Sequence, residues 1–222
     1  AQAPAARAPQ AVVPPSAAPA PSPPRGQPAA MGTEALFGLC GKDFVIMAAD
    51  MQSAHSIIRV KSDTDKITKV ENMLFGATGP SCDTSNFVEY IQKNITLHVL
   101  RTGLPLSTKA AANFTRNELA YALRKGPYQA DMLMAGFDAD GPSLYYMDYL
   151  ASLEKVNKAA QGYGAFFTLG LMDRYYKPDL SLDEAKDIIR KCIKEMETRF
   201  VINLGQYKCK VVDANGIREE AL

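Results

Sequence analysis

Cysteine and histidine are the residues of this chain best suited to metal binding or redox chemistry. The chain holds Cys40, Cys82, Cys192, Cys209, His55 and His98. The cysteines are scattered, with no pair at the close spacing that zinc and redox sites need, and the two histidines lie far apart without an acidic residue at ligand spacing. We therefore predict no metal site and no cofactor. Scattered, reduced thiols are typical of the cytosol and nucleus.

The charged residues nearly balance, with 25 lysines and arginines against 24 aspartates and glutamates. A chain without a strong net charge has no field to attract nucleic acid or an anionic membrane, so we predict neither as a partner. The longest apolar runs, such as 165–172, are much shorter than a bilayer span, and the first residues lack the apolar core of a secretory signal. These features predict a protein of the cytoplasm and nucleus.

Residues 1–30 differ in composition from the rest of the chain. They contain nine of the fourteen prolines, and twenty of these thirty residues are proline or alanine. Because such a segment has too few large apolar side chains to offset its ordering entropy, we predict a disordered tail at 1–30 and one folded domain at 31–222. Arg7 and Arg25, without acidic residues, leave an organelle transit peptide as the weaker alternative, since the prolines oppose the helix that it needs.

The predicted domain opens with short apolar runs separated by turn residues. The runs are 35–40, 44–49, 56–60, 67–70 and 73–78. Their lengths are typical of strands, and the short intervals between them favour antiparallel pairing. We therefore predict that the first third of the domain forms a β meander.

Helical periodicity replaces this pattern in the middle of the chain. Apolar residues recur every four positions over 87–99, which predicts a helix at 82–102. Ser107 is suited to cap a second helix, and this helix is expected to end before Gly126.

Strands are predicted again at 129–137 and 143–150, followed by helices at 166–175 and from Ser181 onward, and by a last hairpin that begins at 207. This order differs from the strict alternation of strands and helices that builds a parallel sheet. It predicts an α+β fold, in which two antiparallel sheets are stacked and a helix pair covers each outer face. The expected architecture is a four-layer α-β-β-α sandwich.

Several local strings resemble segments of proteasome beta subunits. They are FVIMAAD at 44–50, GATG at 76–79 and LMDRYY at 171–176, with further similar strings at 87–94, 111–116, 144–150 and 162–166. The resemblance runs from about Leu36 to Ile217, and the last four strings are similar to a non-catalytic type of beta subunit. It implies the N-terminal nucleophile hydrolase fold, which is the same four-layer sandwich.

Active members of that family use an N-terminal threonine, freed by cleavage after a glycine, whose hydroxyl attacks the peptide bond. The resemblance places Asp50 and Lys66 at the site aspartate and the site lysine of the family. It places Gly79 at the glycine that donates a hydrogen bond to the oxyanion. Three positions that support catalysis are therefore kept.

Other positions depart from the pattern of active members. Counting back without gaps from Asp50, the nucleophile position falls on Glu34, whose carboxylate cannot serve as the hydroxyl of an acyl-enzyme cycle. Tyr163 stands where active members carry a small serine. Glu195 and Thr198 align with an aspartate and a serine of active members, so both are changed.

Thr33 follows Gly32 and is the alternative nucleophile. It lies one residue out of register, which in a strand turns a side chain to the opposite face unless a bulge restores it. We therefore expect no catalytic residues in this chain. Asp50 and Lys66 are expected to remain as a buried or half-buried pair that holds the strands together, and Gly79 as a turn glycine.

The resemblance thus implies a non-catalytic structural subunit of the 20S proteasome beta ring, which supports assembly of the chamber for ATP- and ubiquitin-dependent protein degradation. The partners it implies are beta subunits of the same and the opposite ring, alpha-ring subunits and proteasome assembly factors. An active threonine peptidase subunit is the first alternative, and a free-standing hydrolase of the same fold is the second.

Overall fold

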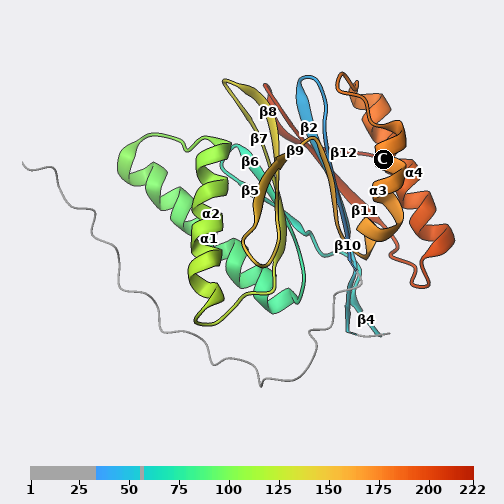
Figure 1. Cartoon of the computed structure of the whole chain (residues 1–222), viewed down its shortest axis with the longest axis horizontal. Coiled ribbons are helices and arrows are strands. Elements are labelled where there is room, and N and C mark those ends of the chain that lie inside the picture. The colour runs from blue at the N-terminus through green and yellow to red at the C-terminus, as the bar shows by residue number, and fades with distance from the viewer. Residues whose placement is uncertain (1–33, 56–57) are drawn as a thin grey trace, which may run out of the picture.

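The computed structural model describes residues 34–55 and 58–222 (Figure 1). In chain order, its elements are β1 (Ala35–Cys40), β2 (Phe44–Asp50), β3 (Ser53–His55), β4 (Ile58–Lys61), β5 (Ile67–Val70), β6 (Met73–Thr78), α1 (Ser81–Thr102), α2 (Thr108–Leu123), β7 (Asp131–Asp138), β8 (Gly141–Met147), β9 (Leu153–Val156), β10 (Lys158–Gly162), α3 (Tyr163–Tyr175), α4 (Leu182–Arg199), β11 (Tyr207–Asp213) and β12 (Gly216–Glu220). The tail predicted at 1–30 lies outside the described residues.

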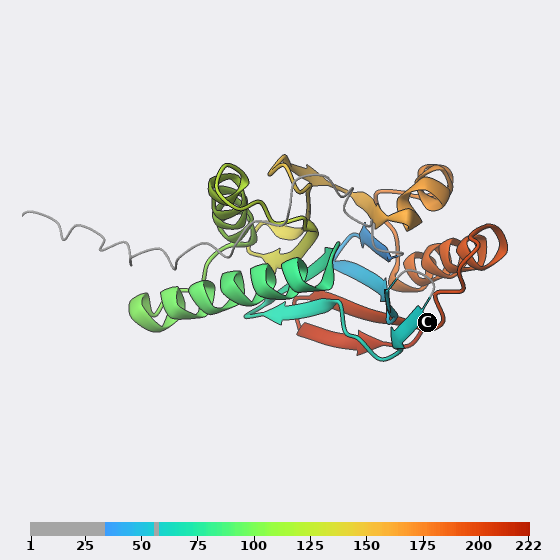
Figure 2. The same cartoon turned by 90° about the horizontal axis from the view of Figure 1, so that it is seen from below.

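Two five-stranded sheets make up the middle of the described structure. One has the strand order β10-β1-β2-β11-β12 and the other β5-β6-β7-β8-β9, with antiparallel pairing throughout. Helices α1 and α2 cover the outer face of one sheet, and α3 and α4 cover the outer face of the other (Figure 1). In the turned view of Figure 2, α1 and α4 again lie at opposite ends of the molecule. The predicted four-layer α-β-β-α sandwich is therefore confirmed.

Buried apolar side chains fill the spaces between the four layers. Strand β1 contributes side chains to two of these spaces: Leu36 packs between the sheets, whereas Phe37 packs under α3 and α4. On the other side, Phe87 of α1 packs against the outer face of the second sheet. Both faces of β1 are covered, which explains why its residues are almost all apolar rather than alternating. Fully burying a side chain such as Leu36 contributes about 1.5–3 kcal/mol.

The ends of the helices follow from local capping. The Ser107 hydroxyl accepts a hydrogen bond from the Ala110 N–H, so it caps α2 as predicted. Ser181 and Glu184 form a reciprocal capping box at the start of α4. Across the described ranges, none of the helices combines the length and apolar character that a membrane span requires.

The prediction of a single β meander in the first third was wrong. Strands β1 and β2 form a hairpin in one sheet, whereas β5 and β6 form a hairpin in the other. Between them, β3 and β4 pair with each other as a small separate sheet, and β4 overlaps the strand predicted at 56–60, of which residues 56 and 57 lie outside the described ranges. Local turn signals indicate pairing between neighbours, but they carry no information on which sheet a hairpin joins.

Two further strands, β9 and β10, were not predicted. β10 has the sequence KAAQG, whose small and polar residues have low β-propensity. It forms nevertheless because it pairs with β1 over its whole length. Its Gln161 also links the two sheets, since Nε2 donates to Met132 O at 2.9 Å and to Met147 O at 3.0 Å.

Candidate functional site

The candidate site lies where the open ends of two hairpins face each other, one from each sheet. In an antiparallel hairpin, the start of the first strand and the end of the second lie side by side. Glu34, before β1, therefore lies near Asp50, at the end of β2. In the facing sheet, Lys66 precedes β5 and Gly79 follows β6. The stacking of the sheets brings these four residues together.

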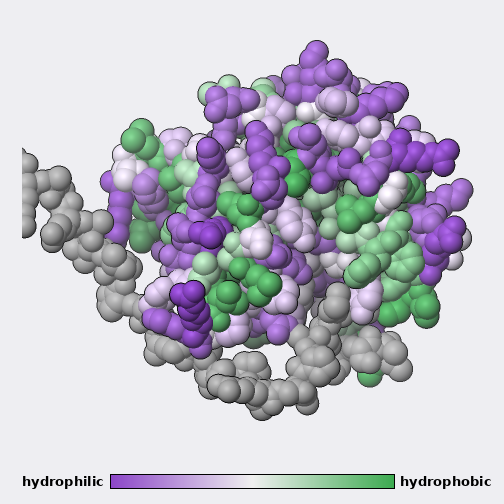
Figure 3. Space-filling view, in the orientation of Figure 1, coloured by the Kyte–Doolittle hydropathy of each residue, from purple (hydrophilic) through white to green (hydrophobic). Residues whose placement is uncertain are grey.

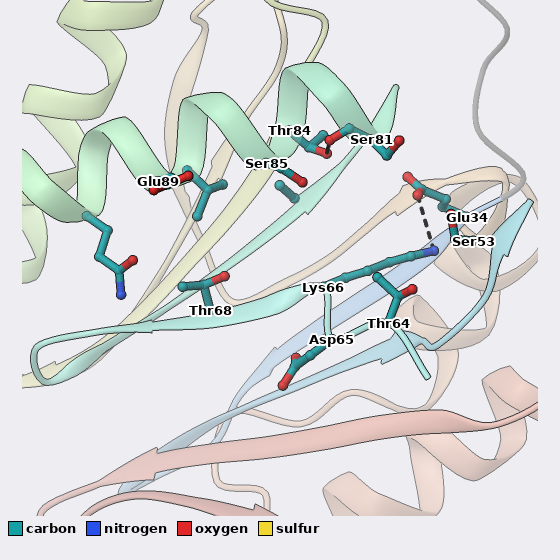
Figure 4. Close-up of a pocket in the computed structure, with 13 residues that line it drawn as sticks. Glu34, Ser53, Thr64, Asp65, Lys66, Thr68, Ser81, Thr84, Ser85 and Glu89 are labelled. Carbon is teal, nitrogen blue, oxygen red and sulfur yellow. Dashed lines mark hydrogen bonds and ion pairs between the residues drawn. The ribbon is translucent and has the colours of Figure 1, made fainter. Parts of the chain in front are cut away.

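The Lys66 ammonium is the centre of this site (Figure 4). Its Nζ lies 2.8 Å from Asp50 Oδ2 and 3.2 Å from Glu34 Oε1. The side chain of Lys66 is 7% exposed and that of Asp50 is fully buried. Asp50 and Lys66 thus form a buried ion pair, and Glu34 adds a second carboxylate to the same ammonium.

Asp50 also accepts hydrogen bonds from the backbone on both sides. The Ala35 N–H lies 2.8 Å from Oδ1, and the Gln52 N–H lies 3.1 Å from Oδ2. Burial raises the pKa of the Asp50 carboxyl, although Lys66 and these two N–H groups act in the opposite direction. The Asp50 side chain therefore connects β1, the end of β2 and Lys66, and these contacts stabilise the fold at this point.

Glu34 also binds the second hydrogen-bond donor of the site, the Gly79 N–H. Its Oε2 accepts a hydrogen bond of 2.7 Å from the Gly79 N–H, the donor that the family resemblance assigns to the oxyanion. Gly79 has a φ of +135°, and a Cβ at this position would lie 2.2 Å from Gln129 O, so only glycine fits. Burial raises the pKa of Glu34, and the Asp50 charge adds to that shift against the pull of Lys66 and the Gly79 N–H.

Tyr163 does not join this group, although its backbone lies nearby. The preceding residue, Gly162, pairs with Ala35, and a Cβ on Gly162 would lie 2.3 Å from Glu34 O. The Tyr163 ring instead stacks on Phe200, with ring centroids 5.5 Å apart. The substitution of the expected serine by tyrosine therefore serves packing between α3 and the end of α4.

The remaining predicted positions lie elsewhere. Glu195 forms an ion pair with Arg199 on α4, and the Thr198 hydroxyl donates to Lys194 O at 2.7 Å. Neither side chain contacts the Asp50 and Lys66 pair. Thr33, the alternative nucleophile, lies outside the described residues.

Sequence reasoning missed the residues that hold Lys66 in place. Lys210 of β11 donates to Asp65 Oδ2 at 2.7 Å, and Lys208 Nζ lies 3.0 Å from the same oxygen. Burial raises the pKa of Asp65, but the hydrogen bonds from Lys210 and Lys208 outweigh it, so the pKa is lowered overall. The available signal was the alternation in β11, which places Lys208 and Lys210 on the same face as the buried Val212.

A cavity of about 200 Å³ opens beside Glu34 and Lys66, between β5 and α1 (Figure 4). Its lining includes the carboxylates of Asp65 and Glu89 and six hydroxyl groups, those of Ser53, Thr64, Thr68, Ser81, Thr84 and Ser85. Within 34–55 and 58–222, no three His, Cys, Asp or Glu side chains group as metal ligands. The arrangement as a whole can hold a carboxylate and polar groups attached to it.

Comparisons with known proteins agree with the family resemblance. A family model described as "Proteasome subunit" matches residues 30–212. The chain is 50% identical over 188 residues to "Proteasome subunit beta type-2-B" of Arabidopsis thaliana, a match that covers 84% of this chain and 94% of that protein. It is 48% identical over 190 residues to "Proteasome subunit beta type-2" of Oryza sativa subsp. japonica, covering 85% and 90%. The protein of that name from Dictyostelium discoideum is 44% identical over 190 residues, covering 83% and 96%.

Proposed function

Because the chain belongs to the proteasome subunit family, we propose that it is a non-catalytic structural subunit of the 20S proteasome beta ring. In this role it assembles with other proteasome subunits and helps to close the chamber in which their peptidase sites act on proteins. About half of the aligned residues are identical to those of beta type-2 subunits, which supports the assignment of this chain to the beta ring.

The position of the Glu34 side chain is the observation that carries the proposal. One oxygen binds the Lys66 ammonium, which would activate a threonine nucleophile, and the other accepts a hydrogen bond from the Gly79 N–H, which would stabilise an oxyanion. A carboxylate has no hydroxyl with which to form the acyl-enzyme. A substrate carbonyl would also find the Gly79 donor already bonded.

The active alternative requires Thr33 to take the contacts with Lys66 that Glu34 makes. It also requires a small residue at position 163, where a tyrosine ring packs against Phe200. Both requirements disfavour a working threonine site in this chain.

We also propose its partners and its compartment. The partners are beta subunits of the same ring and the opposite ring, alpha-ring subunits and assembly factors, in the cytoplasm and nucleus. Exposed apolar surface supports several protein contacts, because such patches mark interaction sites. Figure 3 shows apolar surface over α3 and α4, where Phe166 is 75% exposed, and Leu100 near the end of α1 is 77% exposed.

The test is Thr33→Ala in assembled particles. We expect every peptidase activity of the particle to stay at the wild-type level, since no step of the chemistry uses this hydroxyl. Thr198→Ala is the matched control, because Thr198 lies on α4 and bonds only to Lys194 O among the described contacts. Loss of one activity in Thr33→Ala with assembly intact, or a mature chain that begins at Thr33, would contradict the proposal.

A further inference from the structure

We propose that Lys66 Nζ and the Gly79 N–H form a carboxylate-binding site that this chain fills with its own Glu34. When the Glu34 side chain is removed, the site takes an external carboxylate. The inference uses the same contacts as the proposed function, but its test measures binding instead of peptidase activity. The two can therefore fail separately.

The two donors match the shape of a carboxylate. Lys66 Nζ lies 3.2 Å from Glu34 Oε1, and the Gly79 N–H donates to Oε2 at 2.7 Å. Each oxygen of the carboxylate thus has its own donor, and one of the donors is charged. Such two-point, charge-assisted recognition favours a planar carboxylate over a spherical ion such as chloride.

Neither donor depends on Glu34 for its position. Lys66 is also bonded to the fully buried Asp50, at 2.8 Å. Gly79 lies between Thr78, which pairs with Asp131 in the sheet, and Pro80, which caps α1, so its backbone is held on both sides. Because both donors are held by other contacts, the site stays preorganised without Glu34, and preorganisation lowers the cost of binding.

In the wild-type chain, the Glu34 carboxylate competes with any external ligand. A group tethered beside its site acts at a high effective concentration, so we expect no measurable binding of small carboxylates there. Removing the side chain removes this competitor and leaves space of its own size.

The adjoining cavity extends the range of ligands. It holds about 200 Å³ beside Glu34 and Lys66, and serine and threonine hydroxyls line it (Figure 4). Room of this kind suits a small polar side chain attached to the carboxylate. The ligand class is therefore a free small carboxylic acid or the C-terminal carboxylate of a peptide.

The experiment compares wild-type and Glu34→Ala particles in sodium formate and in sodium chloride of equal ionic strength. We expect the thermal midpoint of Glu34→Ala particles to rise with formate concentration and, above the dissociation constant, to keep rising with its logarithm, because the ligand binds the folded state. Wild-type particles are the control for formate binding at other subunits. Their thermal midpoint should not rise with formate, because Glu34 fills the site. A structure of the variant in formate should show the anion between Lys66 Nζ and the Gly79 N–H.

Two further variants serve as controls. Glu34→Gln keeps the space filled, and Glu34→Ala with Lys66→Met lacks the charged donor, so neither should respond to formate. An N-acetylated dipeptide that ends in serine distinguishes the two ligand sources when it is compared with the same dipeptide as an amide. A larger midpoint shift with the acid than with formate assigns the site to peptide termini, and an equal or smaller shift assigns it to small acids.

An equal response of Glu34→Ala particles to formate and chloride would overturn the proposal. If the variant does not assemble in chloride, assembly itself becomes the measurement. Assembly restored by formate but not by chloride supports the site, and failure in both salts counts against it.

Discussion

Lys210 Nζ lies 2.7 Å from Asp65 Oδ2, so a buried lysine of β11 holds the residue directly before Lys66. The same Nζ donates to Ile67 O, directly after Lys66, at 2.5 Å. These contacts hold the Asp65 carboxylate and the Ile67 carbonyl, on either side of Lys66. They explain how a residue outside a strand can present its ammonium to Asp50 with so little freedom.

Lys210→Met is expected to destabilise the fold. Asp65 keeps Lys208, but Ile67 O loses its donor, and hydrogen bonds to charged groups contribute about 1.5–3 kcal/mol. We expect the lower half of this range because the Asp65 side chain is 36% exposed. The measurement is the denaturant midpoint, with Lys109→Met on the exposed face of α2 as control. A cost no greater than that of the control would show that the Lys210 contacts contribute nothing.

Lys66→Met is expected to cost more than Asp50→Leu. Removing the ammonium leaves two buried carboxylates without a cation, and breaking a buried pair costs about 3–5 kcal/mol. Asp50→Leu leaves Lys66 with Glu34, although the Ala35 and Gln52 N–H groups lose their acceptor.

The double variant of Lys66 and Asp50 should cost less than the sum of the two single variants. It should not be neutral, because the Ala35 and Gln52 N–H groups have lost their acceptor and Glu34, although it keeps the Gly79 N–H, has lost its cation. A double-mutant cycle on thermal stability and on incorporation into particles measures the coupling. Additive costs would mean that the two side chains do not stabilise each other.

Glu34→Gln should change the pH dependence of stability. Burial raises the folded pKa of Glu34 above its ordinary value of 4.5, so the folded protein binds more protons than the unfolded chain between that value and the folded pKa. Stability therefore falls as pH rises through this window. The variant lacks this contribution, so its thermal midpoint relative to wild type should increase from pH 4.5 upward. A constant or shrinking difference in midpoint across the pH series would show that the Glu34 pKa is not raised.

Alanine substitutions at Gly79 and Gly170 should have opposite effects. At Gly79, strain from the positive φ costs about 1–3 kcal/mol, and the clash with Gln129 O adds to it. Gly170 lies on the exposed face of α3, where a Cβ would have no atom within 4 Å, so alanine should stabilise the helix by about 0.5–1 kcal/mol. Thermal unfolding of the two variants measures both. Equal effects would show that the Gly79 backbone relaxes freely.

The fold was largely predictable from the sequence because its helices carry local signals. The caps at Ser107 and Ser181 and the apolar periodicity of α1 are all encoded within a few residues. The assignment of hairpins to sheets, and the existence of β10, depend on pairing with residues far away in the chain. Strand β10 pairs with β1 across more than one hundred positions, so no local pattern predicts it.

For the candidate site, the residues were predictable but the contact that matters most was not. Register counting placed Glu34 at the nucleophile position, and the resemblance placed Asp50, Lys66 and Gly79. That Glu34 bonds to both Lys66 and Gly79 depends on the distance between two sheets, which the sequence does not specify. Lys210 was missed for the same reason, since its partner Asp65 precedes a strand of the opposite sheet.

The Gln161 amide has a mechanical consequence for the site. Apolar contacts between the sheets are non-directional, whereas a hydrogen bond has a preferred geometry. Gln161 directly precedes Gly162, the pairing partner of Ala35. Its hydrogen bonds to Met132 O and Met147 O oppose movement of one sheet relative to the other. The 2.7 Å contact of Glu34 with Gly79 bridges the same seam, so its length reports any sliding of one sheet over the other.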